Sequence, residues 1–292
     1  MKTLCLNCQG LGQPEAVQEL GSLVQLHRPW LVFLLETRFF DDKVDGLQRQ
    51  LGFTNGFGVG SFGRGGGLAL LWTQDIDVQV ESYDKLHIDA EVREPSTQGA
   101  TWRFTGFYGE SRRELRHRSW ELMKFLRTRN TLPWLCAGDF NEILDATEQF
   151  GGLVRLESQM DGFQDVVEVC GFADLGFSGL PWTWDNRQDG DRNVKVRLDR
   201  GLATANFLDL FRDTTVRHVQ TTESNHCCLV IECYRKDRAR RRGPKQFRYE
   251  NMWKHDPSYL GMVRGVCEIV GESNDLMQLQ TGLGQVRGAM QD

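Results

Sequence analysis

Short apolar runs that stop at polar residues recur along the first 234 positions of the chain. The clearest of them, residues 134–137, leads directly into Gly138-Asp139-Phe140-Asn141. Such a run is typical of a buried strand that ends at a sheet edge. Side chains two positions apart on a strand share a face, so Asp139 and Asn141 are expected to reach one target together. An Asx turn is the simpler explanation of Gly-Asp-x-Asn alone, so any chemistry needs support from the rest of the chain.

The N-terminal part predicts two more such strands around one helix. Residues 3–8 and 30–35 have strand-like apolar patterns, and Pro14 begins a helix between them. The first strand stops near Asn7 and the second stops at Glu36. This alternation predicts an α/β sheet with polar groups at its rim.

The middle of the chain predicts an antiparallel meander. Glycine-rich residues 52–67 lack the Gly-Lys-Ser/Thr ending of a phosphate-binding loop, so we interpret them as a turn before a strand at 68–72. Apolar and polar residues then alternate at 78–80, 87–92 and 102–108. This period of two predicts paired antiparallel strands.

Helical periodicity predicts a long helix before the central strand. Ser111 is its expected cap, residue 130 is its approximate end, and Phe125 is among its inward-facing residues, with the arginines mostly outward. The remaining expected elements are helices at 160–170 and 204–211 and strands at 194–198, leading into Asp199, and at 227–234.

The segment 179–186 interrupts this pattern with Trp182 and Trp184. We interpret it as a hairpin that either wedges against a nucleic-acid duplex or contributes two core tryptophans. Thr183, between the two, is a candidate substrate contact.

Composition sets the broad class of the protein. With 292 residues, 40% hydrophobic and 26% charged, the chain can bury a large core. It contains no apolar run of about 18 residues and no signal-peptide layout, so we expect an intracellular protein without a membrane span. The eight cysteines lack finger-like metal spacing, and most are expected to be reduced and packed.

Charge is distributed unevenly along the chain. Residues 1–234 hold 24 Lys and Arg against 33 Asp and Glu, whereas the rest hold 11 against 7. An acidic body is a poor passive binder of nucleic acid, but it suits a cation-dependent site rich in carboxylates. The basic run 238–242 marks a change in composition, so we place one domain at 1–236 and a basic, weakly structured connector at 237–292.

Polar groups at the ends of the predicted strands form a candidate catalytic constellation. They are Asn7, Glu36, Tyr108, Asp139, Asn141, Asp199 and His226. The chemistry that fits them is metal-assisted hydrolysis of a phosphodiester. Glu36, helped by Asn7, would hold Mg2+, or Mn2+ in its place. Asp139 would position or deprotonate the attacking water, Asn141 would donate to the phosphate, and His226 would bind or protonate a phosphate oxygen.

Six motifs in this order resemble the endonuclease/exonuclease/phosphatase superfamily, and within it the apurinic-type endonuclease domain of plant LINE (non-LTR) retrotransposons. They are Leu6-Asn7-Cys8-Gln9-Gly10-Leu11-Gly12, Leu35-Glu36-Thr37, Gly106-Phe107-Tyr108-Gly109, Gly138-Asp139-Phe140-Asn141, Arg197-Leu198-Asp199-Arg200 and Ser224-Asn225-His226. The resemblance covers residues 2–234. Residues 247–253 resemble the connector that precedes a reverse transcriptase in such elements. Since no polymerase follows, the chain resembles an isolated N-terminal fragment of such an element.

The resemblance implies an α/β fold in four layers, with two packed mixed sheets flanked by helices, and Mg2+-dependent nicking of DNA. It assigns metal binding to Asn7 and Glu36, catalysis to Asp139 and Asp199, and phosphate-side roles to Tyr108, Asn141 and His226. Ser224 joins Thr183 as an expected substrate contact. A DNA-nicking protein of this kind is expected to be a monomer, nuclear if its substrate is genomic DNA.

Two residues depart from the family pattern. Leu6 stands where the family usually has Trp, which predicts a packing change. Asn225 stands where it usually has the Asp expected to orient and charge the histidine, which predicts a weakened enzyme. Asn225→Asp is accordingly expected to raise nicking about tenfold or more.

Two other functions remain open from the sequence. The first is a phosphatase acting on a soluble phosphoester, because one fold hosts many activities. The second is a catalytically inactive nucleic-acid-binding remnant, which Asn225 and the basic run after residue 235 favour. Metal-dependent plasmid nicking separates the proposed nuclease from the inactive module, and release of inorganic phosphate identifies the phosphatase.

Overall fold

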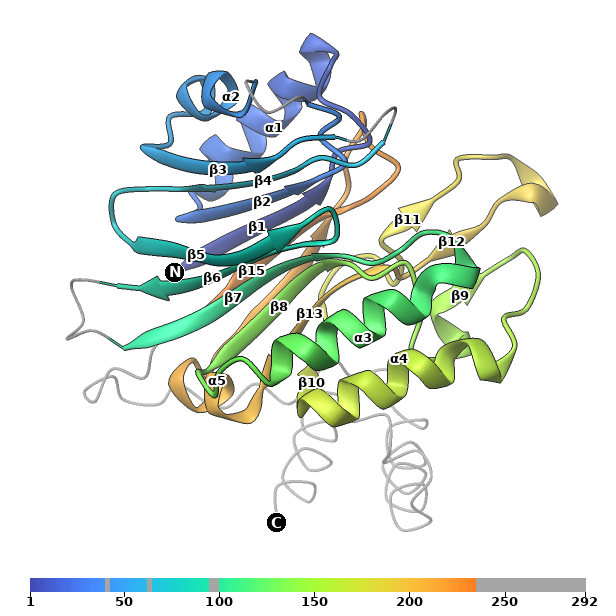
Figure 1. The fold of residues 1–292 in the computed structure, drawn as a ribbon. Coiled ribbons are helices and arrows are strands. Elements are labelled where there is room, and N and C mark those ends of the chain that lie inside the picture. The colour runs from blue at the N-terminus through green and yellow to red at the C-terminus, as the bar shows by residue number, and fades with distance from the viewer. Residues whose placement is uncertain (40–42, 62–64, 95–99, 235–292) are drawn as a thin grey trace, which may run out of the picture. The chain divides into compact units, whose positions relative to one another are not determined.

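Two six-stranded sheets pack face to face in the computed structural model, which describes residues 1–39, 43–61, 65–94 and 100–234 (Figure 1). The expected domain boundary at 236 and the connector after it lie outside the described residues.

The first sheet is built around two parallel strands connected by a helix. Strands β1 and β2 are parallel because α1 (Pro14–His27) carries the chain back between them. All other pairs in this sheet are antiparallel. In spatial order the strands are β14 (Thr215–Val219), β15 (Cys228–Glu232), β1 (Lys2–Asn7), β2 (Leu31–Leu35), β4 (Leu68–Trp72) and β3 (Asn55–Val59).

The second sheet contains the expected meander and the central strand. Strands β5 to β7 pair antiparallel, and β8 lies parallel to β7 because α3 (Arg116–Arg127) connects them. In spatial order the strands are β10 (Phe172–Asp174), β13 (Asp199–Thr204), β8 (Trp134–Asp139), β7 (Thr101–Tyr108), β6 (His87–Arg93) and β5 (Asp77–Asp84).

Helices cover the outer face of each sheet and complete the four layers (Figure 1). The first sheet is covered by α1 and α2 (Val44–Leu51), and the second by α3 and α4 (Glu157–Cys170). The expected four-layered α/β sandwich is therefore confirmed. The remaining elements are α5 (Ala205–Leu210), the short helices η3 (Arg113–Leu115), η4 (Ala146–Glu148) and η5 (Gly190–Arg192), and a small sheet of β11 (Trp184–Asp185), β12 (Lys195–Val196) and β9 (Gln149–Phe150).

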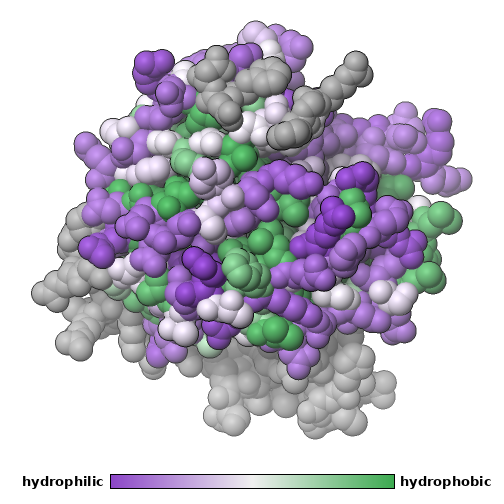
Figure 2. Space-filling view, viewed as in Figure 1, coloured by the Kyte–Doolittle hydropathy of each residue, from purple (hydrophilic) through white to green (hydrophobic). Residues whose placement is uncertain are grey.

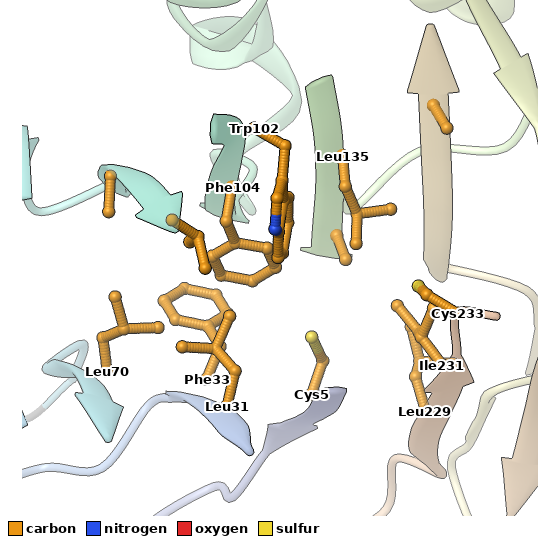
Figure 3. Packing of buried hydrophobic residues seen from close by; sticks show 14 of the residues in the cluster. Cys5, Leu31, Phe33, Leu70, Trp102, Phe104, Leu135, Leu229, Ile231 and Cys233 are labelled. Carbon is orange, nitrogen blue, oxygen red and sulfur yellow. The ribbon is translucent and has the colours of Figure 1, made fainter. Parts of the chain in front are cut away.

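The main core lies between the two sheets. Figure 3 shows Phe33 and Leu31 of β2 facing Trp102 and Phe104 of β7 across the interface. The Phe33 and Phe104 rings meet edge to face with centroids 6.1 Å apart. Because apolar side chains fill this layer, the functional polar side chains are confined to the sheet ends and outer faces.

The pattern of the sequence missed several elements, among them α2, β3, β9, β10 and β14. The glycines of β3 have a structural reason, because a Cβ at Gly56 or Gly58 would come within 3 Å of side chains of α2. Helix α2 thus lies directly on β3 and leaves room only for glycine at these positions. Because of these glycines, the sequence of the strand resembles that of a loop.

The long helix also differs from the expectation. The α-helix begins at Arg116 rather than at Ser111, after the short helix η3. Phe125, expected to face inward, is 57% exposed, whereas Trp120 and Met123 fill the interface with the second sheet.

The surface shown in Figure 2 is largely hydrophilic, with separate hydrophobic patches. The most exposed large apolar side chains, Leu153 and Val154, belong to the loop between β9 and α4. Among the described residues no helix is long and apolar enough to cross a membrane. The seven described cysteines are buried and free, as expected.

Gly106 in β7 offers a test of the packing between the sheets. An added Cβ there would lie 2.4 Å from the Phe33 ring, so Gly106→Ala is expected to lower the free energy of unfolding by about 1–3 kcal/mol. The control is Gly46→Ala in α2, where no atom lies within 4 Å and alanine should add about 0.5–1 kcal/mol. Urea denaturation measures both, and equal stability of the two variants would contradict this account of the core.

Candidate active site

Six strands bring the predicted polar groups to one end of the sandwich. β1, β2, β7 and β8 end there, and β13 and β15 begin there, because they run antiparallel to their neighbours. Asp199 is paired directly with Asp139 across β13 and β8. The expectation that Asp199 ends a strand was wrong, since it begins β13, but the antiparallel direction delivers it to the same edge.

Asn7 connects two carboxylates at this edge. Its amide nitrogen donates to Glu36 Oε1 at 3.1 Å and to Asp139 Oδ2 at 3.0 Å, while its Oδ1 accepts the Gln9 backbone N–H. The Tyr108 hydroxyl also donates to Glu36 Oε1, at 2.8 Å. Burial and the Glu36 charge raise the pKa of Tyr108, so the phenol stays protonated and acts as a neutral donor.

Glu36 adopts a backbone conformation that a glutamate rarely takes. Its φ is +49°, in the left-handed region, which costs about 1–2 kcal/mol for a residue with a Cβ. Asn141 also has a positive φ, of 56°, which asparagine tolerates better. Strain of this kind directly after two strands is typical of a functional edge.

Asp139 is the most enclosed carboxylate of the cluster. Its Oδ1 accepts the backbone N–H of Asn141 at 2.8 Å, and the Asn141 amide nitrogen donates mainly to the Gly109 carbonyl, at 2.9 Å. Burial and the nearby Asp199 charge raise the pKa of Asp139 to about 7. The carboxyl is therefore poised to exchange a proton near neutral pH.

His226 faces both aspartates. Its Nδ1 lies 2.9 Å from Asp199 Oδ2, and its Nε2 lies 4.0 Å from Asp139 Oδ2. Burial lowers the pKa of His226, but the charges of Asp199 and Asp139 outweigh this effect and raise it to about 9. At neutral pH the ring is an imidazolium with its Nδ1–H donated to Asp199.

This geometry corrects the role expected of residue 225. The carboxylate that orients and charges His226 is Asp199, so the neutral Asn225 does not leave the ring without an anionic partner. The Asn225 backbone N–H donates to Gln9 Oε1, and its carbonyl accepts the Asp185 N–H. The gain expected from Asn225→Asp therefore loses its physical basis.

Thr183 and Ser224 have hydroxyls that are occupied within the protein. Thr183 Oγ1 accepts the backbone N–H groups of Leu198 and Asp199, at 2.9 and 2.8 Å. Ser224 Oγ donates to the Asn7 carbonyl and accepts the His226 N–H. Both side chains are buried, and both fix the backbone of site residues instead of presenting a free hydroxyl to a substrate.

The loop that carries His226 is held by three residues without a predicted role. Glu19 of α1 accepts the backbone N–H groups of Thr222 and Glu223. Arg187 donates to carbonyls of the same loop, and Gln9 accepts from it. Gln9 stood inside a recognised motif, but Glu19 and Arg187 gave no signal, because their partners lie 203 and 34 or more positions away.

The donor set of the site fits a hard divalent cation. Glu36, Asp139 and Asp199 crowd one edge with one imidazolium among them, and the half-exposed Arg38 approaches Glu36 only to 3.9 Å. The amide nitrogen of Asn7 stands between Glu36 and Asp139. Oxygen donors with a deficit of positive charge suit Mg2+ or Mn2+. Asp139, Asp199 and His226 also have ligand atoms within 4.8 Å of one another, but a protonated ring that donates to Asp199 has no lone pair to offer there.

The chain belongs to the endonuclease/exonuclease/phosphatase family, whose sequence model matches residues 4–218. No curated protein matches the sequence. Membership makes the protein a hydrolase of the class that includes nucleases and phosphatases, with a fold whose activity is typically metal-dependent.

Several solved structures share the fold at low sequence identity. A 3′–5′ exonuclease from Neisseria meningitidis has a TM-score of 0.61 at 16% identity, over 80% of this chain and 99% of that one. The endonuclease domain of TRAS1, a telomere-specific non-LTR retrotransposon, has 0.59 at 16%, over 81% and 99%. A mannosyl-6-phosphatase from Bacteroides thetaiotaomicron has 0.55 at 16%, over 80% and 99%. An exonuclease, an endonuclease domain and a phosphatase thus share the architecture.

The His226–Asp199 pair predicts a pH-dependent stability in EDTA. The pKa of His226 in the folded protein, about 9, lies above the ordinary histidine value of 6.5. The charged His226–Asp199 pair therefore adds about 3 kcal/mol to the free energy of unfolding. This contribution is fully present below pH 6.5 and is lost as the pH rises through about 9.

In Asp199→Asn, the free energy of unfolding measured with urea should fall much less between pH 6 and 10 than it does in the wild type. The midpoint of the His226 titration, measured by NMR, should also be lower. The control is Asp209→Asn at an exposed position of α5. A midpoint that stays near 9 in Asp199→Asn would show that another group charges the ring.

Proposed function

We propose that the protein is a Mg2+-dependent phosphodiesterase that nicks DNA, of the kind found in plant non-LTR retrotransposons. The observation that supports this most is the contact of Asp139 with Asn7 and Asn141, opposite the imidazolium of His226. One carboxylate with a pKa near neutral, amide donors and a fixed positive charge are the groups that phosphodiester hydrolysis needs.

The residues of the chain divide the work as follows. Asp139 orients and deprotonates the attacking water, because its carboxyl has a pKa of about 7. Asn141 and Tyr108, which donate to Gly109 and Glu36 in the structure, would redirect their hydrogen bonds to the phosphate oxygens when the substrate binds. His226 stabilises the charge that develops on the phosphate. Asp199 and Thr183 keep the imidazole in place. Glu36 and Asn7 would hold the divalent cation, which supplies further charge stabilisation when bound.

The intact His226–Asp199 pair removes one of the two reasons for the inactive-module alternative, the loss of a charge partner at Asn225. The other reason, the basic run after residue 235, lies outside the described residues. The phosphatase alternative remains distinguishable by its product. A DNA substrate agrees with one solved structure of similar fold, a Neisseria 3′ phosphatase bound to a product DNA hairpin, although that likeness shows the fold alone.

Nicking of supercoiled plasmid with Mg2+, with EDTA as the control, tests the proposal. Asp139→Asn should reduce the rate about 100-fold or more, since the amide can neither accept the proton of water nor support the cation. Asp161→Asn, on the exposed face of α4, is the matched control and should keep the wild-type rate. Release of inorganic phosphate without nicking would instead identify a phosphatase.

The proposed boundary at 236 has its own test. A fragment of residues 1–236 should fold and cleave, but should bind DNA more weakly and with a smaller dependence on salt, because the run of arginines at 238–242 is removed. Binding is measured by fluorescence anisotropy between 50 and about 200 mM salt. An insoluble fragment would show that the boundary is wrong.

A further inference from the structure

A pocket beside His226 is not used by the chemistry proposed above. It has a volume of about 370 Å3 and lies between the segment 180–187 and the loop 220–227. Trp182, Arg187, Gln220 and Asn225 are among its lining residues. This volume is within the range of about 300–1,000 Å3 that is usual for small-ligand sites.

The two walls of the pocket are tied together by backbone hydrogen bonds. Cys227 N–H donates to the Thr183 carbonyl at 2.6 Å, and Asp185 N–H donates to the Asn225 carbonyl at 3.0 Å. The isolated bridge between Trp184 and His226 joins the same segments. The pocket is therefore preformed, and its wall is continuous with the backbone that positions His226.

The charge of the pocket argues against a phosphate as its occupant. Arg187 lines it, but the Arg187 guanidinium donates to the carbonyls of the loop 221–224. His226 is also a lining residue, and the charge of its ring is engaged by Asp199 on the side of the sheet edge. Asp185, in the lining too, carries a negative charge. A phosphate placed here would meet one carboxylate and two cations that are already paired within the protein.

The remaining groups suit a flat, uncharged ligand with hydrogen-bonding edges. Trp182 is half-buried and lines the pocket. Its ring packs edge to face on Phe150, and the Lys195 ammonium lies over the ring, 4.3 Å from its centroid. The Asn225 backbone is fixed on both sides, by Gln9 and Asp185, while its side-chain amide has no hydrogen-bond partner among the described residues. An aromatic wall and a positioned amide that is free to donate and accept are the groups that recognise nucleobases.

We propose that this pocket receives a nucleobase of the DNA strand next to the scissile phosphate, and that Asn225 reads the edge of that base. This inference rests on the proposed nuclease function and specifies its substrate recognition. Asn225 immediately precedes His226, so a base held in the pocket lies one residue from the group that stabilises the phosphate. The asparagine at this position is then a specificity residue, with Asp199 as the charge partner of the histidine.

Sequencing of nick sites in a plasmid pool tests the reading role. Wild type should prefer one base at one fixed position beside the nick by about fivefold or more. Asn225→Ala should flatten this preference, and Asn225→Asp should change which base is preferred, because it loses the amide donor. Asn55→Ala, at an exposed asparagine of β3, should keep the wild-type pattern. A preference unchanged in Asn225→Ala, or absent in wild type, would overturn the proposal.

A binding measurement separates this pocket from the nuclease function. The side-chain amide resonance of Asn225, assigned by comparison with Asn225→Ala, is followed in EDTA while each of the four nucleosides or inorganic phosphate is added. At least one nucleoside should shift it and phosphate should not, and Trp182→Leu should weaken the shift about fivefold or more while Trp182→Phe keeps it. A shift with phosphate only, or with no nucleoside, would contradict a base pocket even in a protein that nicks DNA. A nucleoside-dependent shift in a protein that does not nick would support the pocket and refute the nuclease.

Discussion

Repulsion between carboxylates that are held close together and away from water is the constraint on which this end of the sandwich depends. Asp139 and Asp199 face each other on neighbouring strands, both buried, and Glu36 lies one amide group away from Asp139. Without compensating groups, the carboxylates would become protonated or the protein would unfold. The Asn7 amide and the His226 ring are placed between the carboxylates and reduce the repulsion. Burial, together with the residual repulsion from Asp199, raises the pKa of Asp139, and the crowded carboxylates prepare the edge for a divalent cation.

The position of Asp199 depends on a second layer of charges behind it. Arg200 is fully buried and donates to both Glu148 and Asp174, and Arg197 binds the same two carboxylates. The residues on both sides of Leu198-Asp199 are thereby fixed to Asp174 of β10 and to Glu148 of η4. Removing one partner from such a buried network leaves an uncompensated charge, which typically costs about 3–5 kcal/mol. The network therefore fixes the β12–β13 connection, and with it the orientation of His226.

The sequence predicted those parts of the site that depend on local pattern. Apolar runs that stop at Asn7, Glu36, Tyr108 and Asp139 mark strand ends, and parallel strands end at one edge, so their convergence was predictable. The roles of the Thr183 and Ser224 hydroxyls could not be predicted, because their hydrogen-bond partners come close only after the chain has folded. The partner of His226 could not be read either, since the neighbouring position 225 and the distant Asp199 are equally acceptable in a linear pattern. In the fold, β3 was hidden by the glycines that let α2 approach it.

Several arginines of the body are engaged by carboxylates or carbonyl groups within the protein. Arg103 binds Asp89, Arg116 and Arg155 bind Glu142, and the four carboxylate contacts of Arg197 and Arg200 lie inside the protein. Arg187 donates hydrogen bonds to carbonyl groups of the loop that carries His226. Residues 1–234 also hold 24 Lys and Arg against 33 Asp and Glu, and a body with this net negative charge attracts a polyanion only weakly over distance. Under the proposed function, recognition of a phosphodiester therefore rests on close contacts at the sheet edge, namely the imidazolium, the amide donors and the cation that the site would hold. The salt dependence of DNA binding is then expected to come mainly from the basic sequence that follows residue 234.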